Sequence, residues 1–342
     1  MIDQLIQTKR IFLVGGPGGV GKTTLAASLA LQCAHQGHRT IVLTIDPARR
    51  LAQALGFKDG FNNDLQPVAL GPEAKGTLSA SMLDTTRYFD RVIERFATSE
   101  TQKQKILSNP LYRAMVEGLG GTHEYAAMER LLEIANTSEF DRIIVDTPPS
   151  QNAMELFSAP ERLADFMDNS VLKWFQSNKP WMSVLRTGTR LVMKLFQKLF
   201  GAEFMTQLSG FFDDLEGMQA GFRERNLEVI RWLRDDKTAF LLVNIPQQRR
   251  YRESLEFKSI LDQRQIPLAA MIFNQIDPEA PPYSAETPPN VIKLIQFFET
   301  LIQNQQHWMT QWQETQPSIP ILRIPKLASP PENLRDLMSL LG

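Results

Sequence analysis

Short runs of β-branched and other apolar residues recur along the chain and alternate with segments of helical pattern. Such runs are typical of strands that are buried on both faces of a parallel sheet. We predict six of them, at residues 11–14, 40–45, 143–145, 239–243, 268–273 and 319–324. The alternation predicts an α/β fold, with a mostly parallel sheet flanked by helices on both faces.

Two stretches between the predicted strands have helical patterns and no strand signal. The chain is therefore expected to be a single domain over residues 1–342, with inserted α-helical segments at about 84–138 and 152–236. Proline recurs among polar residues at 277–290, which predicts a surface loop.

Composition narrows the class of protein. The 342 residues are 43% hydrophobic, and 37 Lys and Arg balance 38 Asp and Glu to a net charge of −1. This balance gives no global electrostatic reason to expect a nucleic-acid partner, and we expect none.

The single cysteine, Cys33, excludes an internal disulfide and fits a reducing compartment. No apolar run has the length of a signal peptide or membrane span, so we expect a cytoplasmic protein.

The first predicted strand leads into a glycine-rich segment, GGPGGVGKTT at residues 15–24. Gly16, Gly21, Lys22 and Thr23 fit the phosphate-binding spacing G-x-x-x-x-G-K-[ST], and a helical pattern follows, as this motif requires. Glycines let backbone N–H groups converge on phosphates, and the helix N-terminus adds positive potential. The alternative is a glycine-rich turn with a chance Gly-Lys-Thr, but it would have to combine this spacing with this strand and helix context.

Each residue of the loop then has an expected role. Lys22 would contact the β- and γ-phosphates of a nucleotide, and Thr23 would place its hydroxyl on Mg²⁺. The remaining nucleotide-binding residues predicted in the loop are Gly18, Gly19, Val20 and Thr24.

Two aspartates follow apolar runs, where an open α/β sheet places its ligand crevice. Asp146 ends the run in FDRIIVDTPPS and would hold the Mg²⁺ shell, while Asp46 ends TIVLTID and would position or deprotonate the attacking water. Either aspartate could instead cap the next helix. Proline follows both, which stiffens the two loops and marks them as the candidate switches.

The segments GGPGGVGKTT, TIDPARRLAQALG, GTHEYAAMERL and FDRIIVDTPPSQNAMELFSAPERL resemble the anion-transporting ATPase family over essentially the whole chain. That family contains arsenite-pump ATPases and the targeting ATPase for tail-anchored membrane proteins. The resemblance implies a P-loop fold of the deviant Walker A type, an inserted helical subdomain, and a homodimer that closes around two ATP molecules.

The resemblance also implies roles for individual residues. Asp46 matches the water-activating aspartate, Asp146 matches the Mg²⁺ aspartate, and Asn274 matches the asparagine that contacts adenine. Pro325, Lys326 and Leu327 lie where the adenine loop begins.

One departure from the family concerns the dimer. Family members carry a second lysine early in the loop, which reaches the partner's nucleotide, but Pro17 stands there in this chain. Arg49 or Arg50 is a candidate for the missing charge, because an arginine at the γ-phosphate can stabilise the transition state. The alternative is that both arginines are solvated or packed.

A single cysteine also cannot supply the cysteine cluster of arsenite activation or the paired cysteines of a zinc clamp.

The segment Asn274-Gln275-Ile276-Asp277 resembles the guanine-specifying Asn-Lys-x-Asp pattern, with glutamine in place of lysine. ATP is favoured over GTP because the family comparison assigns Asn274 to adenine and Asp277 begins the proline-rich loop.

The second predicted insertion has features of a partner-binding segment. Residues 154–222 hold six methionines and nine phenylalanines, which suit either a groove for varied apolar partners or a helical core. Basic residues recur every four positions at Arg186, Arg190, Lys194 and Lys198. This amphipathic pattern could face an anionic membrane or an acidic partner, although a plain solvated face is the more frequent explanation of such a pattern.

The sequence thus predicts an ATPase switch that uses ATP and Mg²⁺ and holds a hydrophobic client, such as a membrane-protein segment. The alternative is an ATPase subunit that energises a membrane anion transporter, without activation by arsenite through cysteines.

Overall fold

The computed structural model describes residues 1–45, 50–57, 65–83, 85–118, 122–147, 219–284, 286–331 and 333–341, together with residues 207, 210, 211, 213 and 214. These residues fall into two compact units. The first unit draws on the ranges 1–83, 130–155 and 231–342, and the second on 84–129 and 156–230.

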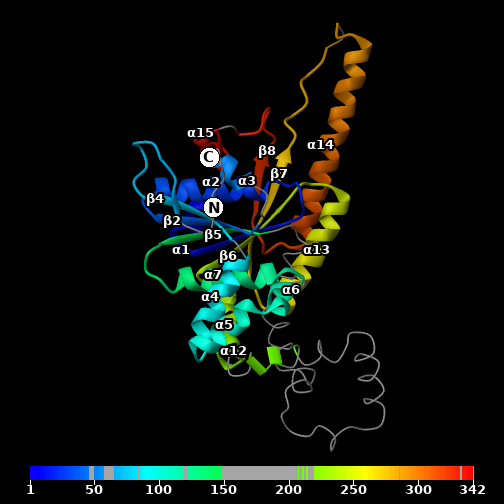
Figure 1. Ribbon diagram of the computed structural model, residues 1–342. Helices are drawn as coiled ribbons and strands as arrows, with labels where there is room; N and C mark the ends of the chain where they lie inside the picture. Colours follow the sequence, from blue (N-terminus) through cyan, green and yellow to red (C-terminus); the bar gives the residue numbers. More distant parts are fainter. Residues whose placement is uncertain are drawn as a thin grey trace, which may run out of the picture. The chain divides into compact units, whose positions relative to one another are not determined.

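The first unit is built on an eight-stranded sheet (Figure 1). From edge to edge its strands are β3 (Gln66–Pro67), β4 (Thr77–Met82), β2 (Arg39–Thr44), β5 (Arg142–Asp146), β1 (Ile11–Gly15), β6 (Thr238–Asn244), β7 (Leu268–Ile276) and β8 (Ile321–Pro325). Only the short edge strand β3 is antiparallel to its neighbour among these strands. The predicted α/β class with a mostly parallel sheet is confirmed.

The central strands are apolar along most of their length because helices cover both of their faces. On one face Phe12 and Val14 pack in a cluster with α2 (Lys22–His35), on which α15 (Leu334–Met338) lies (Figure 1). On the other face the ring of Phe240 lies 5.3 Å from that of Phe257 in α13 (Gln248–Gln263). All five residues of β1 are buried.

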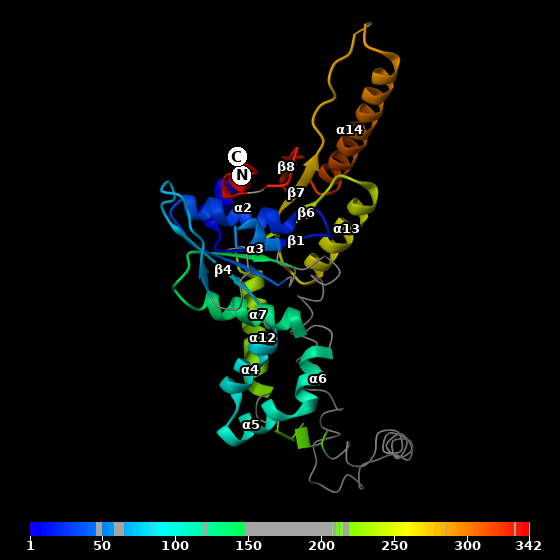
Figure 2. The same ribbon diagram turned by 45° about the horizontal axis from the view of Figure 1, so that its top comes forward.

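The other helices that lie wholly within this unit are α1 (Ile2–Thr8), α3 (Arg50–Ala54) and α14 (Pro289–Thr315). Figures 1 and 2 both show α14 beside α13, next to the edge formed by β7 and β8. The predicted surface loop at 277–290 is non-helical as far as Pro288 in its described residues, after which α14 begins.

The second unit is helical in its described residues. Its helices are α4 (Thr85–Phe96), α5 (Glu100–Ser108) and α6 (Pro110–Gly118), and it shares α7 (Thr122–Ala135) and α12 (Gln219–Arg234) with the first unit. Within it, Arg225 pairs with the buried carboxylate of Glu129, to which the Tyr88 hydroxyl also donates, at 3.4 Å. The predicted bounds of the two insertions, 84–138 and 152–236, stay predictions.

The sequence pattern did not predict β3 and β4. β3 has two residues, and β4 reads TLSASM, in which small and polar side chains hide the apolar run that buried strands normally show. Among the described residues, no helix combines the length and apolar character needed to cross a membrane.

Candidate functional site

The glycine-rich loop begins where β1 ends, between β5 and β6 in the middle of the sheet. Gly16 has φ +149°, and a Cβ atom there would lie 2.1 Å from the backbone oxygen of Val243 in β6. The loop therefore rests directly on the neighbouring strand, and glycine is required both for the conformation and for the space.

The loop ends at the first residue of α2. Gly21, with φ +95°, is the N-cap of this helix and, as a glycine, has no side chain that could cap the N–H groups of the first turn. Uncapped N–H groups at a helix start are donors for an anion, and the helix dipole adds attraction for negative charge. Thr23 and Thr24 are half-buried in this first turn. The predicted phosphate-binding residues Gly21, Lys22, Thr23 and Thr24 thus lie together at the N-terminus of α2.

The Lys22 side chain lies inside the loop. It is only 7% exposed, and its Nζ donates to the backbone oxygen of Pro17 at 2.9 Å. Gly18 and Gly19 are exposed, whereas Pro17 and Val20 are buried. A buried ammonium group needs a strong acceptor, and phosphate oxygens are stronger acceptors than a peptide oxygen.

Asp146 lies at the carboxyl end of β5, beside the start of the loop. It is 1% exposed, pairs in register with Val14 of β1, and accepts a hydrogen bond from the Thr44 hydroxyl at 3.3 Å. The next residue, Thr147, donates from its N–H and hydroxyl to the Val14 oxygen, at 3.2 and 2.9 Å. These bonds hold the acidic end of β5 against the strand that carries the loop.

A hydroxyl on α2 and a carboxylate on β5 fit a Mg²⁺ ion whose other ligands are phosphate oxygens and water. Thr23 and Asp146 would be these two protein ligands. In the part of the chain that the structure describes, no group of three or more His, Cys, Asp or Glu residues could hold a metal ion. A Mg²⁺ site of the nucleotide type does not need such a group.

A pocket of about 300 Å³ opens beside the loop, on the side of β7 and β8. Gly21 and Thr24 line it from α2, and Asn274 and Gln275 line it from β7. The other lining residues are Pro325, Lys326, Leu327, Ala328, Ser329, Pro330, Pro331 and Leu340. The structure therefore brings together the predicted phosphate-binding and base-binding residues.

Asn274 joins this pocket to the loop. Its Nδ2 donates to the backbone oxygen of Val20 at 2.8 Å, and a Cβ at Gly21 would lie 2.3 Å from the same nitrogen. Gln275 donates to the Gly19 oxygen at 3.3 Å and has φ +58°. The end of β7 therefore touches the loop through two side-chain amides.

Asp277, which the guanine-like pattern would assign to a base, is held elsewhere. Its Oδ1 lies 3.1 Å from Lys326 Nζ, its Oδ2 accepts from Gln305 Nε2 at 2.8 Å, and its N–H donates to Gln305 Oε1 at 3.0 Å. It does not line the pocket described above. A guanine base therefore lacks the carboxylate that the Asn-Lys-x-Asp pattern supplies, which favours ATP.

Several predicted residues lie outside the described residues. They are the general-base candidate Asp46, the candidate cation Arg49, and the basic residues Arg186, Arg190, Lys194 and Lys198. Arg50 begins α3, but its side chain also lies outside the described part. Their roles stay predictions.

A second connection between β6 and the loop, which runs through α13, was not predicted from the sequence. Asn244, the last residue of β6, is fully buried, and its Nδ2 donates to the Arg250 backbone oxygen at 2.7 Å. The Arg250 guanidinium in turn donates to the Gly18 oxygen of the loop at 3.3 Å. A polar residue that ends the apolar run TAFLLVN is the signal that could have drawn attention to Asn244.

Comparison with known proteins supports the resemblance. Residues 9–335 match a family described as anion-transporting ATPase. The chain is 27% identical over 292 residues to the protein named ATPase GET3C of Arabidopsis thaliana, covering 80% of this chain and 69% of that protein. ATPase GET3B of the same plant is 29% identical over 305 residues, or 81% of this chain and 67% of that protein.

A bacterial relative shows the same similarity. The protein named putative arsenical pump-driving ATPase 2, from Aquifex aeolicus (strain VF5), is 23% identical over 274 residues, which cover 80% of this chain and 82% of that protein. The family match spans most of the sequence, so the resemblance carried by the motifs is confirmed. The chain is an ATPase that belongs to the anion-transporting ATPase family.

Proposed function

We propose that this ATPase binds Mg²⁺–ATP with its triphosphate in the loop at residues 15–24 and its adenine in the pocket beside Asn274. The observation that carries the proposal is the continuity of the two sites. Gly21 and Thr24 belong to the uncapped start of α2 and also line the pocket. One nucleotide can thus place its phosphates and its base against adjacent surfaces.

In this proposal Lys22 leaves the Pro17 oxygen and binds the β- and γ-phosphates. Thr23 and Asp146 would hold Mg²⁺, which would supply positive charge against the negative charge that develops during phosphoryl transfer. Asp46 orients the attacking water. Competition between ATP and GTP for a fluorescent nucleotide tests the base assignment, and equal affinities would contradict it.

We propose further that the nucleotide opens and closes a homodimer. The support is the family resemblance alone, because Pro17 stands where family members carry the lysine that reaches across the dimer. An Asp46→Asn variant is expected to bind ATP without hydrolysing it. Its mass in solution, measured with ATP and with ADP, should be that of a dimer in at least one state. A monomer in both states would sink this part of the proposal.

The client is proposed to be a hydrophobic protein segment. The support is the concentration of methionine and phenylalanine at 154–222, since flexible thioethers and aromatic rings adapt to varied apolar partners. The probe is a fluorescent apolar helical peptide of about 20 residues, the length of a membrane-spanning segment. We expect Asp46→Asn with ATP to bind it more tightly than the ADP form does. Equal binding in the two forms would contradict the proposal.

The second candidate is an ATPase subunit that drives a membrane anion transporter, which the name of the Aquifex relative favours. The chemistry of Cys33 argues against arsenite as its activator. Cys33 is buried, and burial raises the pKa of its thiol to about 12, so the thiolate that a soft metalloid needs does not form. Recovery of one transporter in stoichiometric amount with the tagged protein would support this candidate. Recovery of varied membrane-protein segments would favour the client proposal.

Contact of the basic residues 186–198 with an anionic membrane is a separate proposal. Flotation with vesicles that contain phosphatidylserine tests it, and no binding with or without ATP would exclude it.

A further inference from the structure

The residues that follow β6 carry positive charge to the rim of the phosphate-binding loop. Within the first turns of α13 stand Arg249, Arg250 and Arg252, and its first turn contains no acidic residue. Cations at a helix N-terminus are unfavourable because they meet the positive end of the helix dipole. Their position is therefore not explained by the stability of α13 alone.

Of these three arginines, Arg250 is the one that the structure shows in contact with the loop. Its Nη2 donates to the Gly18 oxygen at 3.3 Å, and its Nη1 donates to Glu253 at 2.8 Å. Its side chain is 27% exposed. A guanidinium has five N–H donors, so these two contacts leave donors for a further acceptor.

The backbone of Arg250 is held by a hydrogen bond from the end of β6. The buried side chain of Asn244 donates to the Arg250 oxygen at 2.7 Å and also contacts the hydroxyl of Ser254, one turn further along α13. The same asparagine accepts from the N–H of Ile245 at 2.8 Å. The end of β6 thus holds the backbone of Arg250 next to the loop.

Arg249, Arg250 and Glu253 form a cluster of charged side chains whose net charge is positive at neutral pH. Glu253 accepts hydrogen bonds from both Arg250 and Arg249. Burial alone would raise the pKa of Glu253, but the bonds from Arg250 and Arg249 outweigh it and hold the pKa below its usual value. One ionised carboxylate thus neutralises one of the two arginines. A net positive charge is left beside a loop built for an anion.

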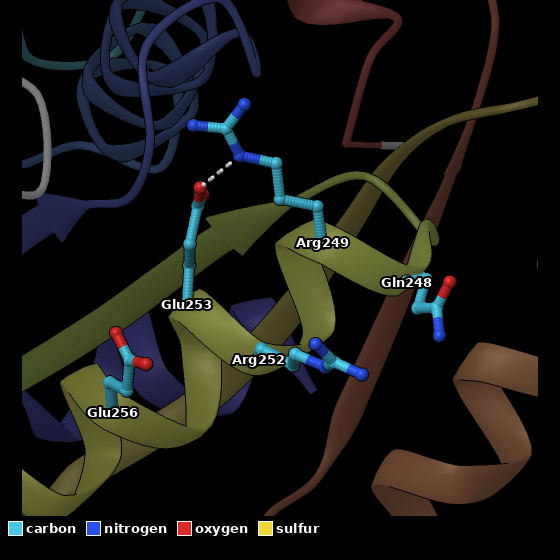
Figure 3. A pocket seen from close by; sticks show the side chains of 5 residues that line it. All are labelled: Gln248, Arg249, Arg252, Glu253 and Glu256. Atoms are coloured by element: carbon cyan, nitrogen blue, oxygen red, sulfur yellow. Dashed lines mark hydrogen bonds and ion pairs between the residues drawn. The ribbon is translucent and has the colours of Figure 1, made fainter.

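Arg249 provides a natural comparison. It shares Glu253 with Arg250, at 3.0 Å, but its side chain is 86% exposed. Figure 3 shows Arg249 bent toward Glu253, and Arg252 on another side of a pocket of about 370 Å³ that Gln248 and Glu256 also line. Arg249 therefore belongs to the same ion cluster but lies on its outer, hydrated side.

We propose that Arg250 is a phosphate ligand of the nucleotide site, which leaves the Gly18 oxygen and donates to the γ-phosphate of ATP bound by the same chain. The inference rests on the proposed binding of ATP in this loop. It gives the site a second cation beside Lys22, on the side where Pro17 supplies none. Because phosphate oxygens are charged, they accept more strongly than the peptide oxygen that Arg250 contacts without nucleotide.

The test compares the affinities for ADP and for a β,γ-imido analogue of ATP, which differ by the γ-phosphate. Arg250→Ala should weaken analogue binding at least about tenfold, as the loss of a charge-assisted hydrogen bond implies, and leave ADP binding within about twofold. Arg250→Lys should recover part of the lost affinity, because it keeps the charge. Arg249→Ala, which breaks the same cluster outside the loop, should change neither affinity.

The outcomes separate the inference from the function on which it rests. If Arg250→Ala weakens ADP and the analogue equally, Arg250 only supports the loop and the inference is wrong. An unchanged analogue affinity overturns it as well. Failure of the wild-type protein to bind either nucleotide would instead contradict the proposed function. Thermal unfolding of each variant shows that the comparison is made on folded protein.

Discussion

Replacement of Gly16 by alanine probes how closely the phosphate-binding loop rests on β6. The new Cβ would lie 2.1 Å from the Val243 oxygen and 3.1 Å from its carbonyl carbon, whereas ordinary contacts begin at 3.4 Å. Val243 is fully buried and lies within a strand paired on both sides, so β6 cannot yield. The loop must therefore move by roughly 1 Å, a displacement that can lower the rate of a positioned reaction about 10²-fold.

The matched control for this variant is Gly19→Ala. Gly19 has φ +80°, so alanine is strained there as well, but nothing lies within 4 Å of its Cβ. It should lower stability by about 1–2 kcal/mol, the penalty of a left-handed L-residue, with little effect on phosphate binding. The comparison thus separates the collision with β6 from backbone strain.

The assay is steady-state ATP hydrolysis together with the affinity for a fluorescent ATP analogue, on protein whose thermal unfolding shows that it is folded. We expect kcat/KM to fall about 10²-fold or more for Gly16→Ala, while Gly19→Ala stays within about tenfold. Wild-type affinity and turnover in folded Gly16→Ala would refute the reasoning, and so would an equal loss in the two variants.

Three further predictions test the pocket and two titrating groups. Asn274→Ala should weaken ATP binding about tenfold but leave competition by inorganic tripolyphosphate unchanged, whereas equal loss of both would mean that Asn274 shapes the loop instead of binding the base. Cys33 should resist iodoacetamide at pH 8 until the protein is denatured, because its raised pKa of about 12 keeps the thiol protonated; rapid labelling of native protein would contradict this. Hydrogen bonds from Arg39 hold the pKa of Asp141 at about 2, below its unfolded value near 4, so this pair stabilises above pH 4 and the gain is lost as pH falls toward 2. Unfolding free energy measured over that range should fall more steeply for the wild type than for Asp141→Asn, and parallel curves would show that the pair contributes nothing.

The sequence pattern was sufficient for the centre of the sheet. β1, β5 and β6 were predicted to within one residue at each end, because the middle of each strand is an unbroken apolar run, as is typical of buried parallel strands. β4 was missed because its residues are mostly small or polar, although it pairs with β2 along six residues. β4 is a strand because it pairs with β2, and such pairing between distant segments cannot be read from a local sequence pattern.

In the nucleotide site, too, features set by local sequence were predicted, whereas contacts between residues far apart in the sequence were not. The loop and Asp146 follow from local signals, namely glycine spacing and an acidic residue at a strand end. The bond between Arg250 and Gly18 joins residues 232 positions apart, and the bond between Thr44 and Asp146 joins residues 102 apart. Such contacts depend on strand order in the sheet. Arg49 and Arg50, which lie close to the candidate switch in sequence, were therefore the predicted candidates for the extra cation, and Arg250 was not among them.

The most direct test of the account is ATP hydrolysis by the purified wild-type protein and by Lys22→Ala, each with Mg²⁺ and with excess chelator. Lys22 is a buried cation inside the loop, and its removal takes away the proposed ligand of the β- and γ-phosphates. The account predicts saturable phosphate release by the wild type with Mg²⁺, at least about 10²-fold less in Lys22→Ala, and none without the metal. Equal hydrolysis by the two proteins, or hydrolysis that persists in chelator, would contradict it.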